Sequence, residues 1–147
     1  FVFGGHCGNL RWDLERAVSL SQFSNRRIYW RITSLALRRW FTIADLLLLP
    51  SHSEGRPTVI YEAMASKTAV LASNVDGIPE QVVDGVTGTL IPPRDTSEMK
   101  SALESLVADR EVLLEMGERG YERLIGQGWT WREHAQKVQT IHQSAIE

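Results

Sequence analysis

The strongest constraint on the fold of this chain is the alternation of short apolar runs with segments of helical periodicity. The apolar runs occupy residues 1–4, 27–30, 46–49, 69–72 and 89–91. Strands that are apolar at every position are buried on both faces, as in parallel sheets that helices cover from both sides. The sequence therefore predicts a doubly wound α/β domain, with a parallel sheet of about five strands and helices on both faces.

Between and after these runs, apolar residues recur three and four positions apart, which is the spacing of an amphipathic helix. One such stripe lies at residues 10–18 and another at residues 99–107. Further helices are expected at residues 35–43, 58–66, 78–83, 111–125 and 131–146. The last of them has a clear start, because Thr130 and Glu133 have the spacing of a capping box.

Length, charge and cysteine content narrow the class of protein. The chain has 147 residues, which suits one domain over residues 1–147, and a net charge of −2, which gives no electrostatic case for nucleic acid. Its single cysteine, Cys7, excludes an internal disulfide and favours a reducing compartment, the cytoplasm. No metal site is expected, since His6 and Cys7 lack further ligands at metal spacing.

We expect no signal peptide. The sequence also contains no apolar run of the ~20 residues that a transmembrane helix needs. The chain opens with FVFGG and has no initiating methionine, so we expect it to be a piece of a longer protein.

Two carboxylates eight positions apart, Glu54 and Glu62, frame the segment EGRPTVIYE. Ser51-x-x-Glu54 has the form of a capping box, which would make Glu54 a structural helix-start residue. That helix would contain Pro57 in its interior, at a cost of about 3 kcal/mol. Proline is favoured at the first helical position, so we expect the helix to begin at Pro57 and Glu54 to lie in the preceding loop.

A hydrolytic pair of acids is disfavoured by distance. Eight residues of helix separate two side chains by roughly 12 Å, at ~1.5 Å per residue. The paired carboxylates of glycosidases lie about 5–9.5 Å apart.

A binding site at the carboxyl end of the sheet is the better interpretation, because ligands of parallel sheets bind there. Gly55 lets the backbone approach a ligand, and the amides of residues 58–60 in the first helical turn suit a phosphate. Glu54 and Glu62 would flank that phosphate and accept hydrogen bonds from hydroxyls. A phosphate between two sets of hydroxyls describes a sugar nucleotide.

The segment ADLLLLPSHSEGRPTVIYEAMASKTAVLASNVDGIPEQVVDGVTGTLIPPRD resembles the donor-binding half of the family-4 retaining glycosyltransferases, which have the GT-B fold. The glutamate, seven residues and second glutamate of that family correspond to Glu54 and Glu62. The segments EGxP, EAMA, GIPE, DGxTG and PPRD also match, and GWTW resembles the start of the family's closing helix. The resemblance is strong over residues 44–95 and weaker before them.

The resemblance implies a role for each matching position. Glu54 would be the catalytic-site carboxylate that holds hydroxyls of the transferred sugar, and Glu62 would bind the nucleotide ribose. Gly55 and the amides of Arg56, Thr58 and Val59 would line the sugar and the pyrophosphate. The backbone of Arg31 and Ile32 would contact the base.

The family transfers a sugar from a nucleotide-sugar to an acceptor with retention of configuration and without a metal or other cofactor. The resemblance therefore implies a UDP- or GDP-linked sugar as the donor. The partner domain would be an N-terminal acceptor-binding domain, absent here together with an opening strand and an Arg…Lys-Gly segment that grips the diphosphate. The resemblance leaves peripheral membrane association of the intact enzyme open. It also implies that Trp129 and Trp131 are exposed, because the closing helix packs on the absent domain.

Three positions depart from the family pattern. Lys67 replaces a glycine that ends a helix in the left-handed conformation, and Ala69 replaces a proline. Asp76 stands where the family usually has a pair of glycines, and it would either repel a phosphate or cap the helix at residues 78–83; we favour the cap. These departures leave an alternative, a degenerate, non-catalytic α/β module that serves protein–protein contacts. Without the opening strand, we expect the strands at residues 1–4 and 46–49 to pair directly, giving the order 2-1-3-4-5.

Overall fold

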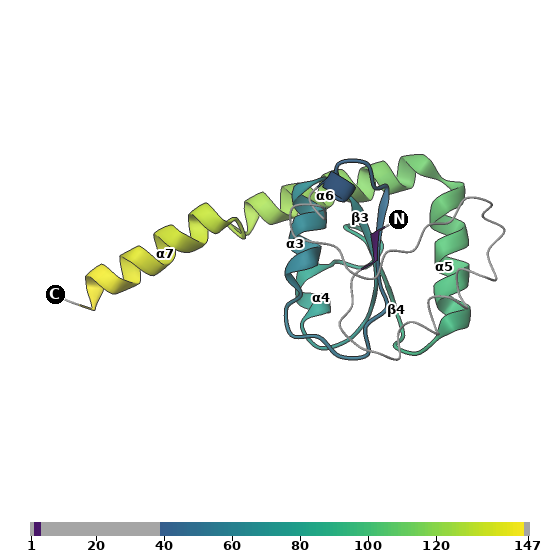
Figure 1. Cartoon of the computed structure of the whole chain (residues 1–147), viewed down its shortest axis with the longest axis horizontal. Helices are drawn as coiled ribbons and strands as arrows, with labels where there is room; N and C mark the ends of the chain where they lie inside the picture. Colours follow the sequence, from purple (N-terminus) through teal and green to yellow (C-terminus); the bar gives the residue numbers. More distant parts are fainter. Residues whose placement is uncertain (1, 4–38, 146–147) are drawn as a thin grey trace.

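The computed structural model describes residues 2–3 and 39–145 of the chain (Figure 1). Its elements are β1 (Val2–Phe3), β2 (Leu46–Leu49), α3 (Thr58–Ala65), β3 (Ala69–Ser73), α4 (Ile78–Gln81), β4 (Thr89–Ile91), α5 (Thr96–Ala108), α6 (Arg110–Gly126) and α7 (Trp131–Ser144). Residues 39–41 are helical as well. The predicted strand at residues 27–30 and the predicted helix at residues 10–18 lie outside the described residues.

The described strands form one parallel sheet in the order β1-β2-β3-β4. Val2 pairs with Leu47, Leu48 pairs with Leu71, and Ala72 pairs with Leu90. The direct pairing of β1 with β2 confirms the expected closure of the sheet. The α/β class, the parallel sheet and the helices on both of its faces are confirmed too.

Every residue of β2 and β3 is buried, and alternate residues enter two separate cores. Leu47 and Leu49 pack with the apolar side chains of α3 and α4, whereas Leu46 and Leu48 pack with those of α5 and the first half of α6. This arrangement follows from the two-residue period of a strand. It explains why these runs are apolar throughout rather than alternating.

The helices are divided between the two faces of the sheet. Figure 1 shows α3 and α4 on one side and α5 on the other, with α6 passing from the α5 side towards α3. The close approach of α6 depends on Gly117, where an added Cβ would lie 2.0 Å from the Lys67 carbonyl oxygen. Gly120, one turn later, faces the side chain of Met64.

Lys67 keeps the left-handed conformation expected at this position, with φ of 58°. A non-glycine residue in this region carries a cost of about 1–2 kcal/mol. Its side chain makes contacts that glycine could not: Nζ lies 2.8 Å from Glu118 Oε1 and 5.3 Å from the centre of the Tyr121 ring. Both contacts are exposed, so they offset only part of that cost.

Helix α7 begins at the predicted capping box, with reciprocal hydrogen bonds between Thr130 and Glu133. None of its residues is buried, and Trp131 is 83% exposed, as expected. Figure 1 shows α7 extending away from the sheet and the other helices. Across the described part of the chain, no helix has both the length and the apolar character needed to cross a membrane.

We predict that Gly117→Ala destabilises the domain by roughly 1–3 kcal/mol, because the added methyl group overlaps the Lys67 carbonyl. Gly126→Ala is the matched control, since it lies in the same helix and a Cβ there meets no atom within 4 Å. The control should be neutral or up to about 1 kcal/mol more stable, as alanine favours helix. Urea unfolding measures both, and equal stability of the two variants would contradict the close packing of α6.

Candidate functional site

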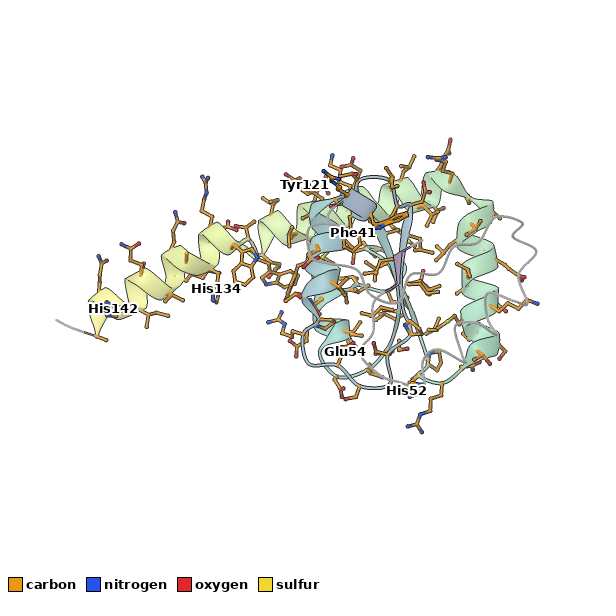
Figure 2. All side chains as sticks on the ribbon, in the orientation of Figure 1. Phe41, His52, Glu54, Tyr121, His134 and His142 are labelled. Atoms are coloured by element: carbon orange, nitrogen blue, oxygen red, sulfur yellow. The ribbon has the colours of Figure 1, made fainter. Side chains whose placement is uncertain are left out.

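The predicted site lies in the connection from β2 to α3, at the carboxyl end of the sheet. Figure 2 shows Glu54 and His52 together at this end of the domain and Phe41 at the opposite end. Helix α3 begins at Thr58, one residue later than expected, and Pro57 is its N-cap residue. Glu54 therefore lies in the loop, as predicted, and no helix begins at Ser51.

Two hydrogen bonds hold Glu54, one at each end of the residue. Ser51 Oγ donates to Glu54 Oε1 at 2.6 Å, and Ser51 is 2% exposed, so the hydroxyl is a rigid donor. The backbone amide of Glu54 donates to Asp76 Oδ2 at 2.8 Å. None of the described residues donates to Oε2, the second carboxylate oxygen. Glu54 is thus fixed in place and keeps one acceptor for a ligand.

Asp76 does not cap α4, so the favoured prediction for this residue is wrong. Gly77 is the N-cap residue of α4 and makes no side-chain capping bond. Asp76 instead has a φ of 44°, and its Oδ2 accepts hydrogen bonds from Ser53 Oγ and the Glu54 amide, both at 2.8 Å. Aspartate visits this region more readily than most residues. With this left-handed backbone, the carboxylate bonds to the loop between Leu49 and Thr58, called the site loop below, and not to α4.

Gly77 holds the same loop through backbone packing. A Cβ on Gly77 would lie 2.1 Å from the carbonyl oxygen of Gly55, a distance that no side chain tolerates. A Cβ on Gly55 would meet nothing within 4 Å, so this glycine faces open space. The two glycines differ in their surroundings. Gly77 lets two backbone segments pack closely, and Gly55 leaves open space in which a ligand would fit.

The amino-terminal turn of α3 offers backbone amides that none of the described residues accepts from. No side chain caps α3. The first amide of this turn that donates a hydrogen bond is that of Ile60, which donates to the Pro57 carbonyl oxygen at 3.3 Å. The amides of Thr58 and Val59 precede it and have no acceptor within a helix. Thr58 is exposed and Val59 half-buried. An anion is favoured here by these donors and by the helix dipole.

Glu62 lies in the middle of α3 and is half-buried. Among the residues that the structure describes, none forms a hydrogen bond or ion pair with its carboxylate. As far as the described part of the chain is concerned, the Glu62 carboxylate is open to hydroxyls of a ligand. Arg31 and Ile32, expected to contact the base, lie outside the described residues.

The side chain of Arg56 contacts Trp129 and Glu80, and neither contact was predicted from the sequence. Its guanidinium carbon is 5.5 Å from the centre of the Trp129 ring, and its Nε is 3.6 Å from Glu80 Oε2. Tyr61 and Arg123 also contact Trp129, at 5.3 and 5.1 Å between group centres. Trp129 is therefore half-buried, and the prediction that it is exposed is wrong. The group that the resemblance assigns to the site is the backbone amide of Arg56, and these side-chain contacts do not involve it.

Gln81, buried in α4, reaches the start of α3. Its Nε2 donates to the carbonyl oxygen of Pro57 at 3.1 Å. The position of the α3 amino terminus thus depends on α4. No spacing rule links residues 57 and 81, so sequence reasoning had no signal for this contact.

Metal chemistry gains no support from the described side chains. In the part of the chain that the structure describes, no three His, Cys, Asp or Glu residues come together in an arrangement that could hold a metal ion. Carboxylates and backbone amides are the groups that this site presents.

Comparison with known proteins gives a consistent result. The family profile "Glycosyl transferases group 1" matches residues 16–123. A D-inositol 3-phosphate glycosyltransferase of Kribbella flavida is 33% identical over 153 aligned positions, which cover 99% of this chain and 35% of that protein. The chain thus spans about a third of this curated relative.

Two solved structures share the fold. Sucrose-phosphate synthase of Thermosynechococcus elongatus superimposes with a TM-score of 0.79 at 26% identity, covering 98% of this chain and 37% of that one. An Anabaena protein solved in complex with UDP-glucose superimposes with a TM-score of 0.64 at 21% identity, covering 78% of this chain and 31% of that one.

We predict that the stabilising effect of Asp76 depends on pH. Hydrogen bonds from the Glu54 amide and then the Ser53 hydroxyl lower the pKa of Asp76 below its ordinary value of 3.8. A carboxyl with a lowered folded-state pKa stabilises the fold above its unfolded pKa, and this effect is lost as the pH falls through the folded-state pKa. Asp76→Asn should therefore be less stable than the parent chain at pH 6–7, and the gap should close below about pH 3.8. Urea unfolding across this range tests it; a gap independent of pH would contradict the assignment.

Proposed function

Because the chain belongs to the family of glycosyl transferases group 1, we propose that it is the donor-binding, carboxyl-terminal domain of a retaining, metal-independent glycosyltransferase of the GT-B type. The observation that carries the proposal is the fixed Glu54 carboxylate beside the uncapped amino terminus of α3. The chain spans about a third of the length of these relatives, so we assign it the donor half of the reaction only.

The first step of the proposal places the diphosphate. The amides of Thr58 and Val59 donate to it, and the positive end of the α3 dipole stabilises its charge. Charge on the diphosphate grows as its bond to the sugar breaks, so these fixed dipoles act in the transition state. The carboxylate of Asp76 also contacts the site loop, at Ser53 and Glu54. The hydrogen bonds that these two residues donate partly offset its negative charge.

The second step places the sugar and the ribose on opposite sides of that diphosphate. Glu54 Oε2 accepts hydrogen bonds from hydroxyls of the transferred sugar, and the exposed residues Gly55 and Arg56 follow it in the loop. Glu62, which the described residues leave without a partner, accepts the ribose hydroxyls. UDP-glucose is a ligand of a structural neighbour, and a UDP- or GDP-linked sugar fits this division.

In the intact enzyme the acceptor hydroxyl replaces the diphosphate on the sugar C1 from the same face. The diphosphate oxygen keeps the bonding electrons and takes the hydroxyl proton. We assign acceptor binding to an amino-terminal domain, so this chain alone should bind nucleotide weakly and transfer sugar poorly.

The alternative of a degenerate module rested on Lys67 and Asp76. Both residues adopt positive φ, at 58° and 44°, as glycines would in their places. The left-handed backbone that suits glycine is therefore present at both positions, and Asp76 is the one of the two that contacts the site loop. This favours the donor-binding function over the alternative.

We predict that Glu62→Ala weakens binding of UDP or GDP roughly 10–100-fold, because hydrogen bonds to a charged group are each worth about 1.5–3 kcal/mol. Calorimetric titration of the 147-residue chain with both nucleotides measures the effect and identifies the base. Glu122→Ala is the control, since Glu122 is an exposed glutamate of α6. Binding that is unchanged by Glu62→Ala, or lost equally in the control, would contradict the proposed ribose site.

A further inference from the structure

We propose that Asp76 is a positioning residue, which fixes the Glu54 backbone so that the free carboxylate oxygen of Glu54 meets the donor sugar. The inference rests on the proposed function and adds a residue that does not itself touch the ligand. Asp76 is joined to the site loop across 22 and 23 positions of sequence, through the Glu54 amide and the Ser53 hydroxyl.

Asp76 acts together with a second, buried tether, the hydroxyl of Ser51. Ser51 holds the side chain of Glu54 through Oε1 at 2.6 Å, and Asp76 holds its backbone through the amide at 2.8 Å. A side chain held only by Ser51 could still rotate with its backbone. With both bonds made, the remaining acceptor, Oε2, has a defined position.

The segment that carries Asp76 is itself anchored. Gly77 packs against the Gly55 carbonyl, and α4 begins directly after it, with Ile78 fully buried. Asp76 is an exposed carboxylate, but the backbone that carries it is held by the packing of Gly77 and Ile78. Its φ of 44° is what directs the side chain back to the loop.

The Asp76 tether also determines which groups of the loop remain for the ligand. The Glu54 amide is already used by Asp76, so it is not a donor to sugar hydroxyls. The sugar must then be bound by Glu54 Oε2 and by the backbone after Gly55. Loss of the Asp76 tether should consequently weaken sugar binding and leave nucleotide binding nearly unchanged, because the α3 amides and Glu62 are elsewhere on the loop and helix.

The test compares Asp76→Gly with Asp76→Asn in the 147-residue chain. Glycine accepts positive φ and removes the acceptor, whereas asparagine keeps an acceptor oxygen and also tolerates positive φ. The probes are UDP with UDP-glucose, and GDP with GDP-mannose as a second pair. We expect Asp76→Gly to weaken the sugar nucleotide about tenfold and the free nucleotide less than twofold, and Asp76→Asn to retain most of the sugar affinity.

A second measurement reports the tether without any ligand. Hydrogen exchange of the Glu54 amide should be faster in Asp76→Gly than in the parent chain and nearly unchanged in Asp76→Asn. Ser53→Ala, which removes the other donor to Asp76, is the replacement variant if Asp76→Gly does not fold, and should weaken the sugar nucleotide in the same direction.

The outcomes separate this inference from the proposed function. Equal losses for nucleotide and sugar nucleotide, or no loss for either, would overturn the positioning role while leaving the donor site intact. Absence of binding for all four probes by the folded parent chain would overturn the proposed function, and the inference with it. A selective loss for the sugar nucleotide, rescued by asparagine, supports both.

Discussion

The burial of β2 on both faces is the constraint on which the site depends. Leu46–Leu49 contributes alternate side chains to the two cores, so the strand cannot shift by one residue without exchanging them. Pro50 and Ser51 continue this buried segment. The hydroxyl that holds Glu54 is thus delivered by the most constrained strand of the sheet, and the flexible part of the connection is reduced to the few residues before α3.

Two departures from the family pattern, Lys67 and Asp76, are better understood as added tethers than as drift. Each accepts the cost of positive φ and gives the fold a side-chain contact that glycine lacks. Lys67 donates to Glu118 on α6, and Asp76 accepts from the Ser53 hydroxyl and the Glu54 backbone amide. Both contacts cross between segments distant in sequence, so each ties the end of one element to another part of the domain.

Sequence reasoning was effective wherever information lies within one element. The periodicity of α5 and α6, the apolar runs of β2 and β3, and the capping box of Thr130 predicted those elements closely. It failed where a side chain acts across a loop: Asp76 was expected to bond to its own helix, and it bonds to residues 53 and 54 instead. Helix-capping rules describe neighbours a few positions apart, and they hold no information on a backbone that turns the other way.

Trp129 illustrates the same limit and completes the description of the site loop. The resemblance predicts that it is exposed, because the closing helix of the family packs on the acceptor-binding domain, yet Arg56, Tyr61 and Arg123 surround its ring. Arg56 thereby ties the loop to the junction of α6 and α7, while Asp76 ties it to the start of α4. The loop is held from two sides by side chains that we do not expect to touch the ligand. Its backbone amides and the Glu54 carboxylate can therefore be positioned before any donor arrives, which is the condition under which fixed dipoles stabilise a transition state.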